Sequence, residues 1–180
     1  MGLLLTLSTL YVPPPLRKRK LELLFTATAD AFQTTRPSTR GLSFDDSLRA
    51  YAHFTRDQAE MAIQQGDESV VGPRLYENAY RIGRQLKADF RVDSTEVMRT
   101  GALLYRMLGI DFQGEPGGTI VIRHCFFSAY YSGPVCRMIS SLDEGLLVGL
   151  AGGGRLSFSQ RITEGNECCL AHLQTDGAPE

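Results

Sequence analysis

The sequence predicts an α+β fold, in which N-terminal helices pack on a small C-terminal antiparallel sheet with one inserted helix. Two observations predict this fold class. Apolar residues recur with helical spacing as far as Gly109, and beyond it the pattern changes to the alternation typical of strands, interrupted by one more helical segment. The chain has 180 residues, 43% of them hydrophobic, which is enough for one domain with a sizeable core.

Residues 1–15 are expected to form an N-terminal extension. Their apolar run has no basic region before it and stops at Pro13, Pro14 and Pro15, so it is too short to span a bilayer and poorly formed as a signal peptide. We interpret it as an extended segment that docks on the domain or on a partner, and a homodimer formed through it is a further hypothesis. Residues 16–174 are then the single domain and residues 175–180 a flexible tail.

The first expected helix covers residues 16–32, with Leu21 and Leu24 on its apolar face. Its basic run, residues 17–20, could indicate a membrane surface or a nucleic-acid contact. The whole chain, however, has 19 basic and 20 acidic residues and a formal net charge of -1. We therefore interpret the run as a solvated helix start and expect neither a nucleic-acid nor a membrane partner.

A linker at residues 34–41 separates this helix from a second one, which begins at Ser43 with Asp46 as an approximate capping box. The same type of signal recurs at Thr55 and Gln58. The second signal predicts a kink, or two consecutive helices, near residue 55.

Pro73 predicts the start of a third helix, because proline is favoured in the first turn. Asp93, followed by Glu96, predicts the cap of a fourth helix that carries Tyr105 in its apolar stripe and ends at Gly109. These helices are expected to act as packing elements.

Four strands and one helix are expected after Gly109. The strands cover residues 110–113, 119–127, 155–162 and 167–173. Pro134 opens the inserted helix, which runs to about Gly149, and the glycine run at 151–154 ends it. That run lacks a following Lys-Ser/Thr pair and leads into a strand, so it predicts a tight connection rather than a phosphate-binding loop.

Strand alternation limits which cysteines and histidines can converge, and two groupings remain open. The first joins two strand cysteines and an arginine with a helix cysteine: Cys125, Cys169, Arg123 and Cys136. The second consists of His124, Cys168 and His172.

Three chemistries are open for these cysteines. Thiolates with a histidine could bind zinc or iron, although no two lie at the close spacing of structural zinc sites. Arg123, or the helix start near Cys136, could lower a thiol pKa and so favour a nucleophile. Free cysteine is also a small residue that often packs in a core. Four cysteines without a CxxC pair indicate a reducing, cytoplasmic compartment.

Asp143 and Glu144 are candidate general acids or bases. Neighbouring residues on a helix diverge by about 100°, so at most one of the two faces a pocket. Arg161 could bind a carboxylate in a bidentate manner, although an exposed sheet face explains it equally well.

The segments RHCFFSAYYSGPVC, SSLDEGLLVGL and RITEGNECC together resemble the L-2-amino-thiazoline-4-carboxylic acid hydrolase-like family, which is similar in turn to the vinyl-reductase (4VR) small-molecule-binding domains. The resemblance covers roughly residues 70–173, and its most specific element is the ending Gly165-x-x-x-Cys169. It implies site roles for Cys125, Cys136 and Cys169, with Cys168 as an extra. The vinyl-reductase type often has an acidic residue and a further cysteine in the strand before that glycine. This chain has Phe158 and Arg161 there, which favours the hydrolase-like branch.

The sequence and the resemblance together predict a small-molecule-binding protein whose polar or heterocyclic ligand lies between the sheet and the helix after Pro134. For an enzyme, the resemblance implies hydrolytic opening of a cyclic amidine or thiazoline-type ring. The implied roles are nucleophile or ligand for Cys125 or Cys169, proton transfer for Asp143 or Glu144, and carboxylate binding for Arg123 or Arg161. The alternatives are a non-catalytic ligand-sensing or scaffold module and a cysteine-ligated metalloprotein. The sequence identifies no cofactor.

Overall fold

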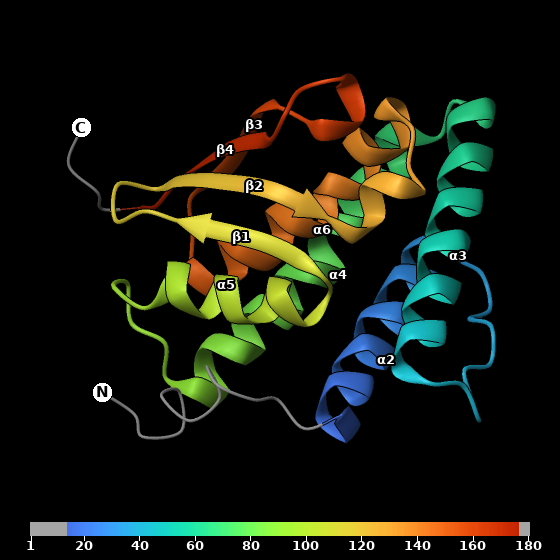
Figure 1. Cartoon of the computed structure of the whole chain (residues 1–180), viewed down its shortest axis with the longest axis horizontal. Coiled ribbons are helices and arrows are strands. Elements are labelled where there is room, and N and C mark those ends of the chain that lie inside the picture. Colours follow the sequence, from blue (N-terminus) through green and yellow to red (C-terminus); the bar gives the residue numbers. More distant parts are fainter. Residues whose placement is uncertain (1–13, 177–180) are drawn as a thin grey trace.

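A computed structural model of the chain describes residues 14–176 (Figure 1). The predictions for the N-terminal extension, for the homodimer and for the end of the tail therefore lie outside the described residues. The helices are α2 (Pro14–Ala31), α3 (Phe44–Gln65), α4 (Glu68–Phe90), α5 (Val97–Met107) and α6 (Gly133–Ala151). The strands are β1 (Ile110–Gly114), β2 (Thr119–Cys125), β3 (Arg155–Gln160) and β4 (Cys169–Gln174), and two short 3-10 helices are η1 (Phe126–Ala129) and η2 (Ile162–Glu164).

The α+β prediction is confirmed. The four strands form one antiparallel sheet in the order β1-β2-β4-β3. Helix α6, which the chain inserts between β2 and β3, packs on β3 and on α4, and α5 packs against β1. Helices α2 and α3 lie at one end of the molecule, at the right of Figure 1. No helix within residues 14–176 is long and apolar enough to cross a membrane.

Helices α4 and α6 approach so closely that glycine is required at their contact. A Cβ atom built on Gly145 of α6 would lie 2.1 Å from the carbonyl oxygen of Tyr76 in α4, and one on Gly149 would lie 2.3 Å from that of Tyr80. From the other side, a Cβ on Gly83 of α4 would lie 2.3 Å from the carbonyl oxygen of Leu146. This contact fixes the position of α6, which carries Cys136 and Asp143 of the site described below.

The predicted kink or break in the second helix is wrong, because α3 is continuous from Phe44 to Gln65. Thr55 does not cap a new helix. Its hydroxyl donates to the carbonyl oxygen of Tyr51, one turn earlier, at 2.9 Å, so the side chain is satisfied inside the helix. The cap at Ser43 is confirmed, since its Oγ accepts the amide hydrogen of Asp46 at 3.1 Å.

The third helix begins earlier than predicted. The amides of Val70 and Val71 both bond to the carbonyl oxygen of Asp67, which starts α4 at Glu68 and places Pro73 inside the helix. Proline at this position lacks the N–H that would bond to the carbonyl oxygen of Ser69, four residues earlier. Asp93 caps the turn just before α5, because its Oδ1 accepts from the amides of Thr95 and Glu96.

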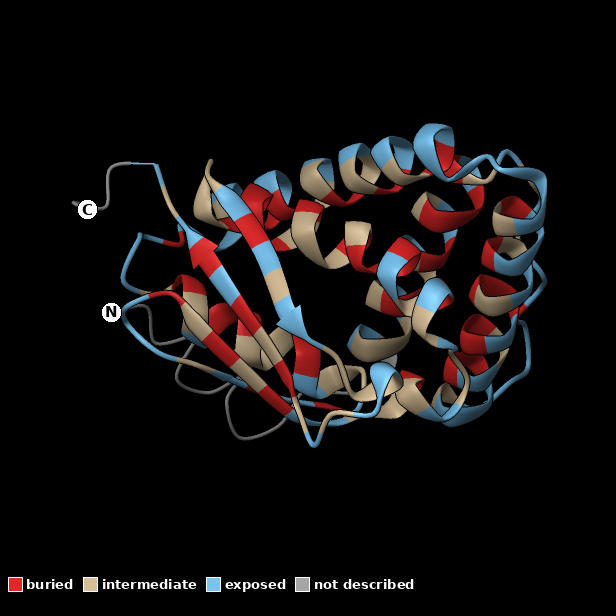
Figure 2. Cartoon of the chain, turned by 90° about the horizontal axis from the view of Figure 1, so that it is seen from above, coloured by how far each residue is buried: buried red, intermediate tan, exposed pale blue. Residues whose placement is uncertain are grey.

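Figure 2 shows that buried and exposed residues alternate along the strands. In β4 the alternation is as predicted: Cys169, Ala171 and Leu173 are buried on the face that packs on the helices. In β2, Ile120 and Ile122 are buried on the same side of the sheet. The sheet thus has one face in the core and one face toward solvent.

Candidate functional site

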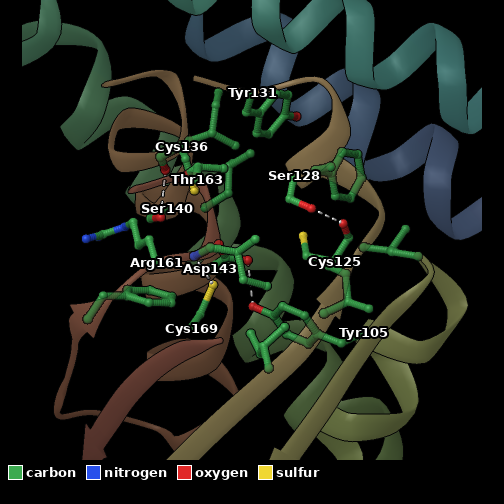
Figure 3. Close-up of a pocket in the computed structure, with 18 of the residues that line it drawn as sticks. Tyr105, Cys125, Ser128, Tyr131, Cys136, Ser140, Asp143, Arg161, Thr163 and Cys169 are labelled. Carbon is green, nitrogen blue, oxygen red and sulfur yellow. Dashed lines mark hydrogen bonds between the residues drawn. The ribbon is translucent and has the colours of Figure 1, made fainter. Parts of the chain in front are cut away.

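A cavity of about 90 Å³ lies between α6 and the end of the sheet where β2 stops and β4 begins (Figure 3). All four strands, four of the helices and both 3-10 segments contribute to its wall, which is largely apolar. The polar side chains in the wall, apart from cysteines, are Tyr51, Tyr105, Ser128, Tyr131, Ser140, Asp143, Arg161 and Thr163. An engineered apolar cavity of about 150 Å³ accepts benzene, so this volume as it stands holds a few water molecules, and a ligand the size of a substituted five-membered ring would displace part of the wall.

A β-bulge brings Cys125 into this wall. Ile110 pairs with Cys125 and Phe112 pairs with Ile122, so β2 has one residue more than β1 between these pairs. The extra residue moves Cys125 onto the cavity side with Ile122 and leaves Arg123 exposed on the outer side. The predicted sharing of one face by Cys125 and Arg123 is therefore wrong, because simple alternation does not allow for the bulge.

A second bulge lies in β3, near the same end of the sheet. Phe158 pairs with Ala171 while Gln160 pairs with Leu170, so β3 carries the extra residue. The chain turns after this bulge, and Arg161, Ile162 and Thr163 line the cavity. Bulges often occur beside functional sites because they redirect side chains.

The three cysteines implied by the resemblance all line the cavity. Figure 3 shows Cys125, Cys136 and Cys169 around Asp143; they come from the end of β2, the first turn of α6 and the start of β4. Among the described residues, no group of three or more His, Cys, Asp or Glu side chains is arranged to hold a metal ion. The metalloprotein alternative thus has no ready ligand set in this part of the chain.

Burial keeps these thiols neutral. It raises the pKa of Cys125 to about 12, and it also raises the pKa values of Cys136 and Cys169. The amide of Ile162 donates to the sulfur of Cys169 at 3.4 Å, which opposes the rise at that thiol. Because the thiolate is the nucleophilic form, this environment does not activate the cysteines.

Asp143 faces the cavity and Glu144 does not. This agrees with the expectation that at most one of two neighbouring helix residues faces a pocket. Burial raises the pKa of Asp143 from 3.8 to about 6. The hydroxyl of Tyr105 donates to its Oδ1 at 2.7 Å, and this bond and the positive charge of Arg161 both oppose the rise. A carboxyl group with this pKa is mostly ionised at neutral pH but gains a proton in mildly acidic solution.

Two buried polar atoms in the wall have no hydrogen-bond partner within residues 14–176. They are Nε of Arg161 and Oγ1 of Thr163; of the two, Oγ1 of Thr163 also faces the thiol of Cys136, and this interaction lowers the pKa of that thiol. The guanidinium of Arg161 lies over the ring of Phe158, 4.7 Å from its centroid, and in Figure 3 it points away from Asp143. An unpaired buried polar group is costly, so atoms of this kind indicate a place where a ligand or water completes the hydrogen bonding.

The other polar groups in the wall form hydrogen bonds within the protein. Ser128 donates to the carbonyl oxygen of Cys125 and Ser140 to that of Cys136, each at 2.7 Å. The hydroxyl of Tyr131 bonds to that of Thr55 in α3. These bonds fix the backbone on both sides of the cavity and leave Asp143, Thr163 and Nε of Arg161 as the polar groups available to a ligand.

Several predicted residues lie elsewhere. Arg123 is exposed and donates to Gln113, and Glu144 is outside the cavity wall. The alternative grouping is also not in the wall: His124 and His172 are exposed, and Cys168 is partly exposed. Of the predicted acid and arginine candidates, the cavity thus brings together Asp143 and Arg161.

Sequence reasoning missed Tyr105 and Thr163 as site residues. Tyr105 was expected only to pack, although a tyrosine within an apolar helical stripe is itself a signal, because a buried hydroxyl needs a partner. Thr163 gave no signal, since its place in the cavity depends on the bulge in β3 and on the turn that follows.

Comparison of the chain with protein-family models, with curated proteins and with solved structures found no match.

Proposed function

We propose that this chain is a small-molecule-binding protein and that the cavity around Asp143 is its ligand site. The observation that carries the proposal is a carboxylate with a pKa of about 6 inside an apolar cavity whose wall also holds two unpaired polar atoms, on Arg161 and Thr163. Apolar pockets with a few convergent polar groups and perturbed pKa values are typical of ligand sites.

The polar groups favour a ligand with two different ends. Oδ2 of Asp143 has no hydrogen-bond partner among residues 14–176, so it can accept from an amidine or amine that carries positive charge. Nε of Arg161 and Oγ1 of Thr163 can donate to a carboxylate or carbonyl oxygen at the other end. A compact cyclic amidine with a carboxylate has this pattern. The resemblance to the amino-thiazoline hydrolase-like family implies the same class of ligand.

Hydrolytic ring opening is the catalytic form of this proposal. Asp143, ionised at neutral pH, would accept a proton from a water molecule whose oxygen attacks the amidine carbon. The oxygen of that water becomes the carbonyl oxygen of the product. One water proton passes from Asp143 to the ring nitrogen as the carbon–nitrogen bond breaks, and the second, released as the carbonyl forms, also ends on that nitrogen, which leaves as an ammonium group. Neutral thiols with raised pKa values favour this route over attack by a cysteine.

A binding experiment tests the site. We expect 2-amino-thiazoline-4-carboxylic acid to raise the melting temperature of the protein and to bind in calorimetry at pH 7.5. Asp143→Asn, which keeps the shape but removes the charge, should weaken binding by about tenfold or more, because a hydrogen bond to a charged group contributes about 1.5–3 kcal/mol. Asp111→Asn, at an exposed carboxylate of β1, is the matched control. Equal binding by both variants would refute the assignment of the site.

A non-catalytic ligand-sensing module is the second candidate, and the raised thiol pKa values favour it over a hydrolase that attacks through a cysteine. Incubating the protein with the same thiazoline and following ring opening by mass spectrometry distinguishes the two. Stabilisation without product supports the sensing module. Product formation that is lost in Asp143→Asn supports the hydrolase.

A further inference from the structure

A second, smaller cavity lies beside the first. It has a volume of about 60 Å³ and is enclosed by α2, α4, α5 and α6. Three leucines, Leu24, Leu108 and Leu146, line both cavities, so the two adjoin at these shared side chains. The rest of the second wall is mainly aliphatic and includes Leu86 and Leu104. Its shape and chemistry suit a hydrocarbon chain.

Two cations of α2, Arg17 and Lys20, also line this aliphatic cavity. They belong to the basic run at the start of α2, which the proposed ligand site does not use. The guanidinium of Arg17 lies over the ring of Phe44, 4.1 Å from its centroid, and donates to the carbonyl oxygen of Met107 at 3.2 Å. These contacts hold it at the cavity.

The ring of Phe44 and the carbonyl oxygen of Met107 compensate the charge of Arg17 only in part. No carboxylate within residues 14–176 forms an ion pair with Arg17, and its Nε is buried without a hydrogen-bond partner. A buried donor on a cation, beside an aliphatic cavity, is complementary to an anion that carries an apolar chain.

We propose that the second cavity binds a straight-chain aliphatic carboxylate, with its carboxylate at Arg17 and Lys20 and its chain among the leucines. Longer chains would extend past Leu24, Leu108 and Leu146 toward the first cavity. This site does not depend on Asp143, so it goes beyond the function proposed above and can fail or succeed separately.

The test is calorimetry with the wild-type protein and two series of single-chain probes, alkanoates and alkylammonium ions of increasing length, all below their micelle concentrations. We expect alkanoate affinity to rise by about fourfold per methylene, from about 0.8 kcal/mol per buried CH₂, until the cavity is filled. Alkylammonium ions of equal length should bind at least tenfold more weakly. Equal binding of the two series would overturn the proposal, because it would show a non-specific apolar effect.

Two variants locate the site. Arg17→Gln should reduce alkanoate affinity by about tenfold, whereas Arg19→Gln, at an exposed arginine of the same helix that does not line the cavity, should leave it unchanged. Leu104→Phe places a larger side chain in the second cavity alone and so reduces its free volume. This variant should selectively weaken binding of the longer alkanoates. Circular dichroism checks folding, and Lys20→Gln replaces Arg17→Gln if that variant does not fold.

The remaining outcomes are also decisive. Loss of alkanoate affinity in Arg19→Gln as large as in Arg17→Gln would overturn the proposal. Binding to anionic lipid vesicles without binding to free alkanoates would do the same, since it would indicate a membrane surface. Thiazoline binding that depends on Asp143 but no alkanoate binding would remove only this inference. Alkanoate binding without thiazoline binding would remove only the function proposed for the first cavity.

Discussion

Tyr105 and Asp143 are joined in the cavity wall by a hydrogen bond of 2.7 Å, which links α5 to α6. The phenol donates to Oδ1 and so fixes the orientation of the carboxylate. The bond leaves Oδ2 of this cavity-lining residue available to a ligand. The bond also stabilises the charged carboxylate, which opposes the effect of burial on its pKa. Tyr105 thus fixes the direction of the carboxylate and limits how far burial raises its pKa.

Tyr105→Phe should raise the pKa of Asp143 further above about 6, because it removes the donor that stabilises the ionised form. The measurement is a pH titration of the Asp143 carboxyl carbon by NMR. Tyr51→Phe is the matched control: this tyrosine also lines the cavity but bonds to Thr28, so the pKa of Asp143 should change little. An unchanged titration in Tyr105→Phe would show that the bond does not control the protonation of Asp143.

Asp143 should make the folded protein less stable as the pH rises from about 4 to about 6. In this range the folded state keeps a proton on Asp143 that the unfolded state, with a pKa near 3.8, has lost. The folded state then binds more protons, so the free energy of unfolding falls with pH. A pKa that burial raises from 3.8 to about 6 contributes about 3 kcal/mol to the free energy of unfolding at low pH. This contribution is lost as the pH rises through about 6.

Denaturant unfolding of the wild type and of Asp143→Asn at several pH values isolates this contribution from that of other carboxylates. We expect the difference between the two proteins to grow in favour of the variant between pH 4 and pH 6 and to stay constant above. The amide can still accept from Tyr105, so the variant keeps the bond between α5 and α6. A difference that does not vary with pH would contradict the raised pKa.

The sequence predicted the site residues whose position depends only on the periodicity of their own strand or helix. Alternation placed Cys169 on the buried face of β4 because no bulge interrupts that strand. It misplaced Cys125, because a bulge depends on which strand pairs with β2 and not on the residues of β2 alone. The helical angle between Asp143 and Glu144 predicted that only one would face a pocket, but choosing between them required Tyr105, 38 residues away in the chain.

The cavity cysteines should react slowly with alkylating agents. With a pKa of about 12, only about one Cys125 side chain in ten thousand is a thiolate at pH 8. Brief labelling with iodoacetamide, followed by peptide mass spectrometry, should modify Cys168, which is outside the cavity wall, before Cys125, Cys136 or Cys169. In denaturant all four should label at similar rates. Fast labelling of Cys125 in the folded protein would reveal an activated thiol and restore the nucleophile hypothesis.

Gly145→Ala should destabilise the protein, although alanine favours helices. The new Cβ would lie 2.1 Å from the carbonyl oxygen of Tyr76 and 2.9 Å from the amide nitrogen of Tyr80, and both are backbone atoms that cannot move without displacing α4. Forcing volume into a tight contact costs about 1–3 kcal/mol, which exceeds the gain of about 1 kcal/mol from replacing a helical glycine. Denaturant unfolding measures the difference.

Gly117→Ala provides the matched control, because a Cβ there meets no atom within 4 Å and its backbone is not in the left-handed region. Its unfolding free energy should stay within about 0.5 kcal/mol of the wild type. Because α6 carries Cys136 and Asp143, the displacement in Gly145→Ala should also weaken thiazoline binding, whereas Gly117→Ala should bind normally. Wild-type stability and binding in Gly145→Ala would mean that α4 and α6 do not pack through this glycine contact.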